Sequence, residues 1–420
     1  MTVTSADAGI LVVGASQAGL QVATSLRDLG ETGPITLIGE EVHPPYQRPP
    51  LSKTFLAGQG VPDSLTFRSP DFFRRAGIDL LTGMRITEVS MGSAGGVAVT
   101  DTGRSLRFER LALTVGARPR RLALSGAELA GVCYLRGLDD AIRLRDLAGS
   151  ADDVVVIGGG FIGLEVAASI RALGRRVTVV EAADRLLARA VAPVVSDFYR
   201  QAHERRGTAV LTSRTVTDLR GHGGRVAEVV LDDGDVLPAQ VVVIGVGVEP
   251  ATELAEQLGL DCRGGIVVDT ACRTSNPAVV AAGDCAVQPN PLTGDGLIRL
   301  ESVQNAVAQG RTAAASLAGK PAPGRTVPWF WSDQDTLKLQ IAGLSAGYDQ
   351  YVLRGDPDTE AFSALYFRDG RLLAVDAINQ PVDYMAVRKA LSIGAQIDPE
   401  RAADPAIPLK SLFSLAPVVL

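Results

Sequence analysis

The chain has 420 residues, of which 46% are hydrophobic and 21% charged, and its formal net charge is −6. This length allows two or three domains, each with a buried core. The negative charge argues against general nucleic-acid binding, and no uncharged apolar run approaches the roughly 20 residues that cross a bilayer. Residues 1–8 lack a secretory signal pattern, and the apolar tail at 412–420 is too short to span. We therefore expect a cytoplasmic protein that uses neither nucleic acid nor membrane, with the tail packed on the last domain.

The chain offers little material for thiol or metal chemistry. Its four cysteines lie far apart, with no C-x-x-C pair, and it has only three histidines. The cysteines are Cys133, Cys262, Cys272 and Cys285. This pattern predicts neither a disulfide framework nor a zinc site.

The first predicted elements form a β-turn-α-β unit. An apolar strand at residues 9–13 leads into a glycine-containing loop, followed by a helix to about residue 29. A second strand at 34–38 ends just before Glu40. The loop consists of Gly14, Ala15, Ser16, Gln17, Ala18 and Gly19. This order of strand, glycine loop, helix and acidic residue is typical of a dinucleotide-binding fingerprint, although Ser16 replaces its middle glycine.

The same unit recurs in the middle of the chain. A strand at 153–157 leads into a second glycine loop and a helix to about residue 173, and the next strand, at 177–180, ends in Glu181. The loop consists of Gly158, Gly159, Gly160, Phe161, Ile162 and Gly163. Glycines let the backbone approach a pyrophosphate at the helix N-terminus, and the acid accepts hydrogen bonds from a ribose. A single such loop can be just a tight strand–helix turn, but two copies, each between a strand and a helix and each with its acid, predict two dinucleotide sites.

The remaining elements complete an α/β chain. Residues 82–121 and 226–246 are rich in predicted strands, 278–282 is another strand, and 302–317 is an alanine-rich helix. A Pro/Gly-rich linker at 319–328 precedes a hairpin at 361–378, whose Asp369-Gly370 pair is a two-residue turn signal. A helix follows Pro381. The sequence therefore predicts two Rossmann-like units and a separate α+β domain at the C-terminal end.

With both units placed, the sequence resembles the two-dinucleotide flavoproteins of glutathione-reductase-like fold. It is most similar to the ferredoxin and rubredoxin reductases (the putidaredoxin type) that serve bacterial cytochrome monooxygenases and Rieske dioxygenases. Beyond the glycine loops, the resemblance rests on short motifs spread over nearly the whole chain. They are RPPLSK at 48–53, TVGARPR at 114–120, GVGVEP at 245–250, AAGDC at 281–285, ESVQNA at 301–306 and PWFWSDQ at 328–334.

The resemblance implies a division into three domains. An interrupted FAD-binding domain covers 1–116 and 247–325, an inserted NADH-binding domain covers 117–246, and the C-terminal α+β domain covers 326–420. FAD would lie on the first glycine loop and NADH on the second.

The resemblance also implies which residues contact FAD besides the first loop. These are Glu40, Arg48, Lys53, Ala117, Arg118, Gly283, Asp284, Ser302, Val303 and Trp331. Asp284 would hold the ribitol chain, though it also fits a helix-cap or turn Asp.

Other positions carry two interpretations as well. Arg48 would lie near phosphate and Lys53 near the flavin ring, but both also fit solvated loop cations. The helix start at Ser302 would place its positive end at the flavin. Trp331 would lie near the flavin–nicotinamide stack, whereas Trp329 is assigned to packing.

A second set of residues is implied for NADH. These are Gly158, Gly160, Phe161, Ile162, Gly163, Glu181, Arg189, Gly245, Val246 and Gly247. The Glu181 carboxylate suits the 2′-hydroxyl of NADH and repels the 2′-phosphate of NADPH; Arg185 and Arg189 are cations that can offset that repulsion. Glu165 would lie near the nicotinamide, or is a surface helix residue. The resemblance assigns catalytic roles to Lys53, Glu165 and Trp331.

These assignments predict an NADH-dependent ferredoxin reductase. Bound FAD would take a hydride from NADH and pass single electrons to a 2Fe-2S ferredoxin or rubredoxin, and so indirectly to an oxygenase. Basic residues near the flavin edge, Arg118, Arg120 and Arg121 or Arg74 and Arg75, would favour an acidic partner, although each also fits a solvated charge. The protein is expected to be a monomer or a homodimer.

Two other functions fit the same scaffold. The absence of cysteine at residues 49–55 disfavours a disulfide reductase, and no peroxidatic cysteine stands near this region. An NADH oxidase or peroxidase would turn over with oxygen or peroxide alone. A flavin redox sensor related to apoptosis-inducing factor would turn over slowly with any acceptor.

Overall fold

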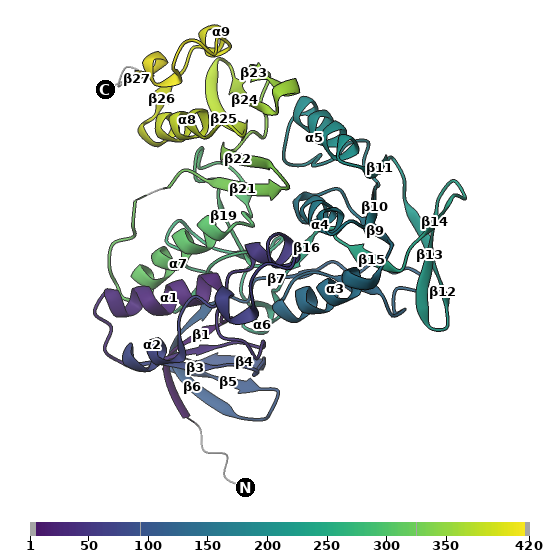
Figure 1. Cartoon of the computed structure of the whole chain (residues 1–420). Helices are drawn as coiled ribbons and strands as arrows, with labels where there is room; N and C mark the ends of the chain where they lie inside the picture. Colours follow the sequence, from purple (N-terminus) through teal and green to yellow (C-terminus); the bar gives the residue numbers. More distant parts are fainter. Residues whose placement is uncertain (1–5, 93, 325, 416–420) are drawn as a thin grey trace. The chain divides into compact units, whose positions relative to one another are not determined.

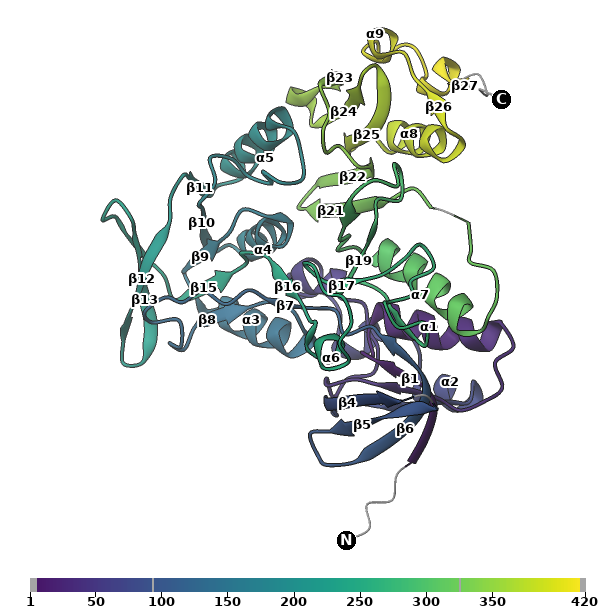
Figure 2. The same ribbon diagram turned by 180° about the vertical axis from the view of Figure 1, so that it is seen from behind.

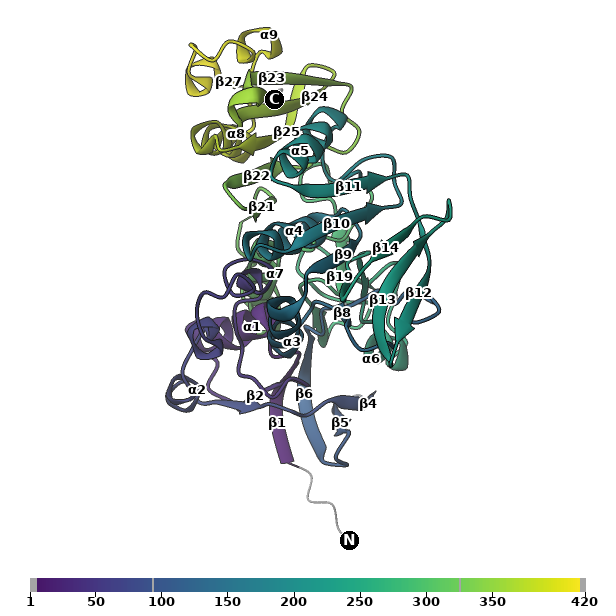
Figure 3. The same cartoon turned by 45° about the vertical axis from the view of Figure 1, so that its right-hand side comes forward.

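The computed structural model describes residues 6–92, 94–324 and 326–415. The chain divides into two compact units, which Figures 1, 2 and 3 show from three directions. The first unit contains Met1–Gln47, Asp63–Arg118 and Glu249–Pro328; the second contains Arg48–Pro62, Pro119–Val248 and Trp329–Leu420. The proposed three-domain boundaries stay a prediction. The end of the apolar tail, 416–420, lies outside the described residues.

The first unit is built on a mixed sheet. Its strand order is β3-β2-β1-β6-β5-β4, with β18 also paired to β6. The central strands are parallel, and Val13 lies level with Ile38 and Leu113 at the sheet edge where the first glycine loop begins. The strands are β1 Ala6–Val13, β2 Ile35–Ile38, β3 Ile78–Leu81, β4 Ile86–Gly92, β5 Gly95–Thr100, β6 Ser105–Leu113 and β18 Val279–Ala281.

Two long helices of this unit pack side by side (Figure 1). They are α1 Gln17–Asp28 and α7 Val303–Leu317. Gly310 permits the close approach, because an added Cβ there would stand 2.8 Å from the Cβ of Gln21. The smaller elements are η2 Pro62–Leu65, α2 Pro70–Arg75, α6 Glu253–Gln257, β17 Ile266–Val267, β19 Ala286–Pro289 and β20 Leu297–Ile298.

The second unit contains a five-stranded sheet in the order β11-β10-β9-β15-β8, all parallel. A parallel sheet is covered by its crossover helices and therefore has strands that are almost wholly apolar. The strands are β8 Val132–Tyr134, β9 Asp153–Ile157, β10 Arg176–Glu181, β11 Thr208–Thr212 and β15 Val241–Ile244; the helices are α3 Leu138–Ser150, α4 Phe161–Ala172 and α5 Pro193–Arg205. A small antiparallel sheet joins β12 Val216–His222, β13 Arg225–Leu231 and β14 Val236–Pro238.

The C-terminal part of this unit is an antiparallel sheet in the order β21-β22-β25-β24-β23, against which α8 packs. Asp369 and Gly370 both have positive φ at the β24–β25 turn, as the sequence predicts for a two-residue hairpin. The elements are β21 Trp329–Gln334, β22 Leu337–Gly343, β23 Gln350–Asp356, η3 Pro357–Thr359, β24 Ala361–Arg368, β25 Arg371–Ile378, α8 Pro381–Ile393, β26 Ala395–Gln396, α9 Pro399–Ala402, η4 Leu409–Leu412 and β27 Ser414–Leu415. The remaining elements are η1 Pro49–Ser52, β7 Ala117–Pro119 and β16 Val248–Pro250.

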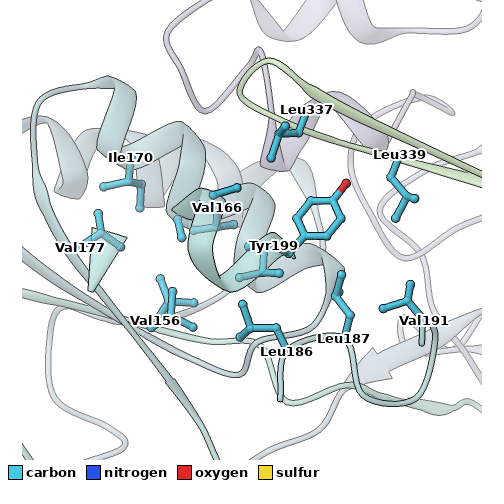
Figure 4. Packing of buried hydrophobic residues seen from close by; sticks show 14 of the residues in the cluster. Val156, Val166, Ile170, Val177, Leu186, Leu187, Val191, Tyr199, Leu337 and Leu339 are labelled. Atoms are coloured by element: carbon cyan, nitrogen blue, oxygen red, sulfur yellow. The ribbon is translucent and has the colours of Figure 1, made fainter. Parts of the chain in front are cut away.

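The two five-stranded sheets of the second unit share one apolar core. Figure 4 shows Leu337 and Leu339 of β22 beside Tyr199 of α5, with Val166 of α4 and Val156 of β9 in the same cluster. All five side chains are fully buried. Removing a large side chain from such a core costs about 2–5 kcal/mol. The C-terminal sheet is therefore held firmly against the parallel sheet.

Candidate functional site

The first glycine loop joins β1 to α1. Gly14 has φ +109, and an added Cβ would stand 2.1 Å from the carbonyl oxygen of Thr114; a Cβ on Gly19 would stand 2.0 Å from the oxygen of Gly14. Only glycine fits at these two positions, because any side chain would collide with the neighbouring backbone. Ser16 is the N-cap of α1 in extended conformation, so the first helical amides point toward the loop. Glu40 is exposed one residue beyond Gly39, as a ribose-binding acid requires.

A second loop of the first unit approaches α1 from β18. Gly283 has φ +86, and a Cβ there would lie 3.1 Å from the Cβ of Ala18. The backbone N–H of Gly283 donates to Gln309 Oε1 at 2.8 Å, and the Gln309 amide in turn donates to Gln288 Oε1 at 2.9 Å. Asp284, the proposed ribitol contact, is the next residue in the chain. The buried Gln309 therefore fixes the loop that carries it.

The N-terminus of α7 is capped by Ser302. Its hydroxyl accepts from the backbone N–H of Asn305 at 3.2 Å, and the Asn305 side chain donates to Gln309 at 3.1 Å. Val303 is the first helical residue. The amides of this 15-residue helix therefore keep a fixed direction, which suits an electron-rich group at its positive end.

Two predicted FAD contacts have partners within their own unit. Ala117 is buried, whereas the exposed Arg118 guanidinium forms a bidentate pair with Glu253, at 2.5 and 3.0 Å. Arg48 donates to the carbonyl of Arg136 at 2.7 Å.

Two of the cations predicted to dock an acidic partner have partners within the protein. Arg74 pairs with Asp71, and the Arg121 guanidinium lies over a tyrosine ring.

The second glycine loop joins β9 to α4. Gly158 has φ +111, and a Cβ there would stand 2.4 Å from the oxygen of Gly245; a Cβ on Gly163 would stand 2.0 Å from the oxygen of Gly158. Gly160 differs, because nothing lies within 4 Å of an added Cβ. Open space at a helix N-terminus is what a pyrophosphate needs, so this loop fits a dinucleotide. Ile162 is 48% exposed on the same turn.

The acid at the end of β10 is held by backbone amides. Glu181 Oε2 accepts from the N–H of Gly159 at 2.6 Å, and Oε1 accepts from the N–H of Ala183 at 2.7 Å. An ionised carboxylate can only accept hydrogen bonds, and both of these bonds use it as an acceptor. Glu181 is thereby presented beside the loop.

The two neighbouring arginines differ in the hydrogen bonds that their guanidinium groups form. Arg185 donates to the carbonyls of Val191 and Ala188 and to the hydroxyl of Ser196, at 2.6–2.8 Å. Arg189 is exposed, and its Nη2 would lie 3.5 Å from a Cβ on Gly247. Gly245 and Val246 follow β15 at the same edge of the sheet. Arg185 is thus a structural side chain, while Arg189 is available to a nucleotide.

A buried ion pair lies at the middle of α4. Glu165 is 1% exposed, and its Oε2 accepts from Lys53 Nζ at 2.7 Å and from Ser52 Oγ at 2.5 Å. Its Oε1 accepts from Ser332 Oγ at 2.6 Å. Glu165 is therefore no surface helix residue, and Lys53 is no freely solvated cation. Three segments far apart in the sequence meet at this carboxylate.

The two tryptophans lie together on β21. Their ring centroids are 5.9 Å apart, and the Trp329 ring also contacts Tyr384 and Arg388. Trp329 packs on the core of the C-terminal sheet, as predicted. Trp331 is half-buried, next to Ser332. Phe161, another predicted contact, packs against Phe330 with the two rings tilted and their centroids 4.6 Å apart.

Sequence reasoning gave no role to several residues of these sites. Ser52, Ser332 and Gln334 stand inside the quoted motifs, so their side chains were visible but had no assigned role. Gln309 and Gln334 are polar residues buried to 3% and 1% exposure. Gln309 lies outside those motifs, and only its position on the buried face of its helix marks it.

The thiols are not poised for chemistry. Burial raises the pKa of every cysteine, to about 12 for Cys272 and about 11 for Cys285. A thiol nucleophile needs a lowered pKa. The described residues also contain no cluster of His, Cys, Asp and Glu that could hold a metal, and no helix among them is long and apolar enough to cross a membrane.

Two dinucleotide loops with their acids, and no reactive thiol, define a two-dinucleotide oxidoreductase. The family model described as "Pyridine nucleotide-disulphide oxidoreductase" matches residues 8–310, and the model "Reductase C-terminal" matches 329–413. The chain belongs to the pyridine nucleotide-disulphide oxidoreductase family. It is a flavoprotein reductase of the ferredoxin-reductase type and uses FAD and NAD(H).

The similarity covers nearly the full length of this chain and of each related protein. Rhodocoxin reductase of Rhodococcus erythropolis is 45% identical over 96% of this chain and 93% of its own length. The structure of a ferredoxin reductase from Rhodopseudomonas palustris is 42% identical, with a TM-score of 0.92 over 97% of this chain and 100% of that one. The reductase in a covalent putidaredoxin reductase–putidaredoxin complex is 37% identical, with a TM-score of 0.93 over 97% and 98%.

Proposed function

We propose that this reductase takes its hydride from NADH in preference to NADPH and delivers single electrons to a small 2Fe-2S ferredoxin or rubredoxin. Bound FAD supplies the conversion from a two-electron donor to one-electron transfer, which a nicotinamide cannot perform. The proposal rests on the pair of dinucleotide loops, one in each unit, each of which lies between a strand and a helix and is followed by its acid. The relatives named for rhodocoxin, putidaredoxin and rubredoxin support an iron–sulfur acceptor.

The residues of the first unit would hold FAD through backbone positions. The loop Gly14–Gly19 offers helix amides to the pyrophosphate, Glu40 would accept from the adenosine ribose, and Gly283 with Asp284 would meet the ribitol. Ser302 and Val303 begin the helix whose positive end would face the flavin. We keep Ala117 and Arg118 of the first unit, and Arg48, Lys53 and Trp331 of the second, as further proposed contacts. Arg118 has the weakest support, because Glu253 occupies its guanidinium.

The residues of the second unit would hold NADH. Gly158 to Gly163 would receive the pyrophosphate, and Gly245 to Gly247 with Arg189 would border the nucleotide. Phe161 and Glu165 would lie toward the nicotinamide end. Lys53 would stand beside the flavin ring with its charge partly balanced by Glu165.

Preference for NADH follows from Glu181. Its carboxylate is fixed by two backbone amides, and it would repel a 2′-phosphate. Arg185 cannot relieve that repulsion, because its guanidinium is committed to two carbonyls and a hydroxyl. Arg189 remains as the single described cation of this loop that can approach the phosphate.

Substitution of Glu181 tests this preference. Glu181→Ala should lower kcat/KM for NADH more than for NADPH, so that the ratio of the two falls by about tenfold or more, since a charged hydrogen bond contributes about 1.5–3 kcal/mol. Glu181→Gln keeps the size and removes the charge. Asp184→Asn removes a neighbouring exposed charge and should leave the ratio nearly unchanged. An unchanged ratio in both Glu181 variants would remove the basis for the donor assignment.

The acceptor is tested by coupled reduction of cytochrome c. Turnover with NADH should depend on added ferredoxin or rubredoxin. Rapid NADH oxidation with oxygen or peroxide alone would instead favour an oxidase or peroxidase. We further propose that the protein lies in the cytoplasm, where NADH and iron–sulfur carriers are both available. We also propose that it acts as a monomer or homodimer.

A further inference from the structure

A row of polar side chains crosses the interior of the second unit and ends at His203, which the proposed function does not use. His203 lies on α5 and is 3% exposed. Its Nε2 is 2.8 Å from Gln334 Oε1, Gln334 Nε2 is 3.2 Å from Ser332 Oγ, and Ser332 Oγ is 2.6 Å from Glu165 Oε1. The row therefore links α5, β21 and α4 to the ion pair of Glu165 with Lys53.

The chemistry of the end group fixes the direction of every bond. A carboxylate paired with a lysine can only accept, so Ser332 donates to Glu165. The Ser332 oxygen then accepts, and the Gln334 amide must turn its NH2 group toward it. The Gln334 carbonyl consequently faces His203, which must carry a hydrogen on Nε2. All three donors point toward Glu165.

The surroundings of His203 favour a neutral ring. Burial lowers the pKa of His203, and the nearby cations Arg206 and Arg171 lower it further. Gln334 and Asp335 act in the opposite direction. A neutral ring with hydrogen on Nε2 keeps the one donor that the row requires.

We propose that His203 and Gln334 are positioning residues for Glu165, and that their one-directional row of donors holds the Glu165 carboxylate against Lys53. Without the row, Ser332 lacks a fixed orientation and Oε1 loses its donor. Only Ser52 and Lys53, both at Oε2, then hold the carboxylate, which can turn about that end and move its charge away from Lys53. Less of the lysine charge would then be balanced. The effect on the cofactor rests on the proposed function, which places Lys53 beside the flavin.

The midpoint potential of the bound flavin measures this balance. An unbalanced cation stabilises the electron-rich reduced ring, so the potential should move to more positive values. Glu165→Gln should give the largest positive shift, and Gln334→Met and His203→Met should give smaller shifts of the same sign. His203→Gln places an amide N–H near the lost Nε2–H and should restore a potential close to that of the wild type. Ser363→Ala, which removes a buried hydroxyl of the same sheet outside the row, should leave the potential unchanged.

Three results would overturn the proposal in distinguishable ways. A positive shift with Glu165→Gln but none with Gln334→Met or His203→Met would remove the positioning role and leave the place of Lys53 intact. No shift with Glu165→Gln would remove the place of Lys53 as well. Equal shifts in His203→Gln and His203→Met, or a shift in Ser363→Ala, would show a general loss of packing. If Glu165→Gln fails to fold, Ser332→Ala replaces it, because it removes the donor to Oε1 directly.

Discussion

The stability of the second unit should depend on pH through one buried carboxyl. Asp376 of β25 is fully buried in the C-terminal sheet; the Tyr366 hydroxyl donates to its Oδ2, and its Oδ1 has no partner among the described residues. Burial raises the pKa of Asp376 to about 7. The ordinary value is about 3.9, so the shift of about 3 pH units corresponds to about 4 kcal/mol.

The sign follows from the direction of the shift. The folded state holds the proton more tightly than the unfolded state, so the contribution is fully present below about pH 4 and is lost as pH rises through about 7. The free energy of unfolding should therefore fall between pH 5 and pH 8. Asp376→Asn keeps an acceptor for Tyr366 without a titrating group, so its stability relative to the wild type should rise by about 2–4 kcal/mol over this range.

Urea unfolding followed by circular dichroism at several pH values measures this difference. Asp369→Asn is the matched control, because Asp369 is an exposed carboxylate of the same sheet and its difference from the wild type should stay flat. A constant difference between Asp376→Asn and the wild type across pH 5–8 would refute the reasoning.

Three further predictions concern other parts of the fold. Arg354→Met should cost about 3–5 kcal/mol and expose the C-terminal segment to proteolysis, because it leaves Asp383 buried without its ion pair; protection equal to the wild type would contradict this. Gly160→Ala should raise the KM for NADH with little change in melting temperature, because its added Cβ meets no protein atom. Gly158→Ala should unfold the loop, because its added Cβ would collide with the backbone of Gly245. Gln309→Leu should weaken FAD binding, measured by equilibrium dialysis, while lowering the melting temperature only slightly, because Gln309 holds the Gly283 loop. A loss of FAD that only follows a large fall in melting temperature would contradict this role.

Local patterns predicted the nucleotide units well. The strand at 153–157 is β9 residue for residue, and the hairpin at 361–378 has its turn at Asp369 and Gly370. Short apolar runs and the placement of glycine decide such elements within a few residues of chain. The family and its cofactors were likewise indicated by motifs that stand in one stretch of sequence.

Contacts between distant segments were not predictable in the same way. Glu165 alone fits a surface helix position, and its burial depends on Ser52, Lys53 and Ser332, which lie more than 100 residues away. Arg185 resembled a possible phosphate ligand until its partners were known. Such roles depend on tertiary packing, which a single sequence does not display.

Electrons from NADH should leave this protein one at a time. Anaerobic addition of limiting NADH to the FAD-loaded protein with excess 2Fe-2S ferredoxin should reduce two equivalents of ferredoxin for each NADH consumed. Ferredoxin that stays oxidised, while NADH is consumed only with oxygen, peroxide or a disulfide, would contradict one-electron transfer to an iron–sulfur acceptor.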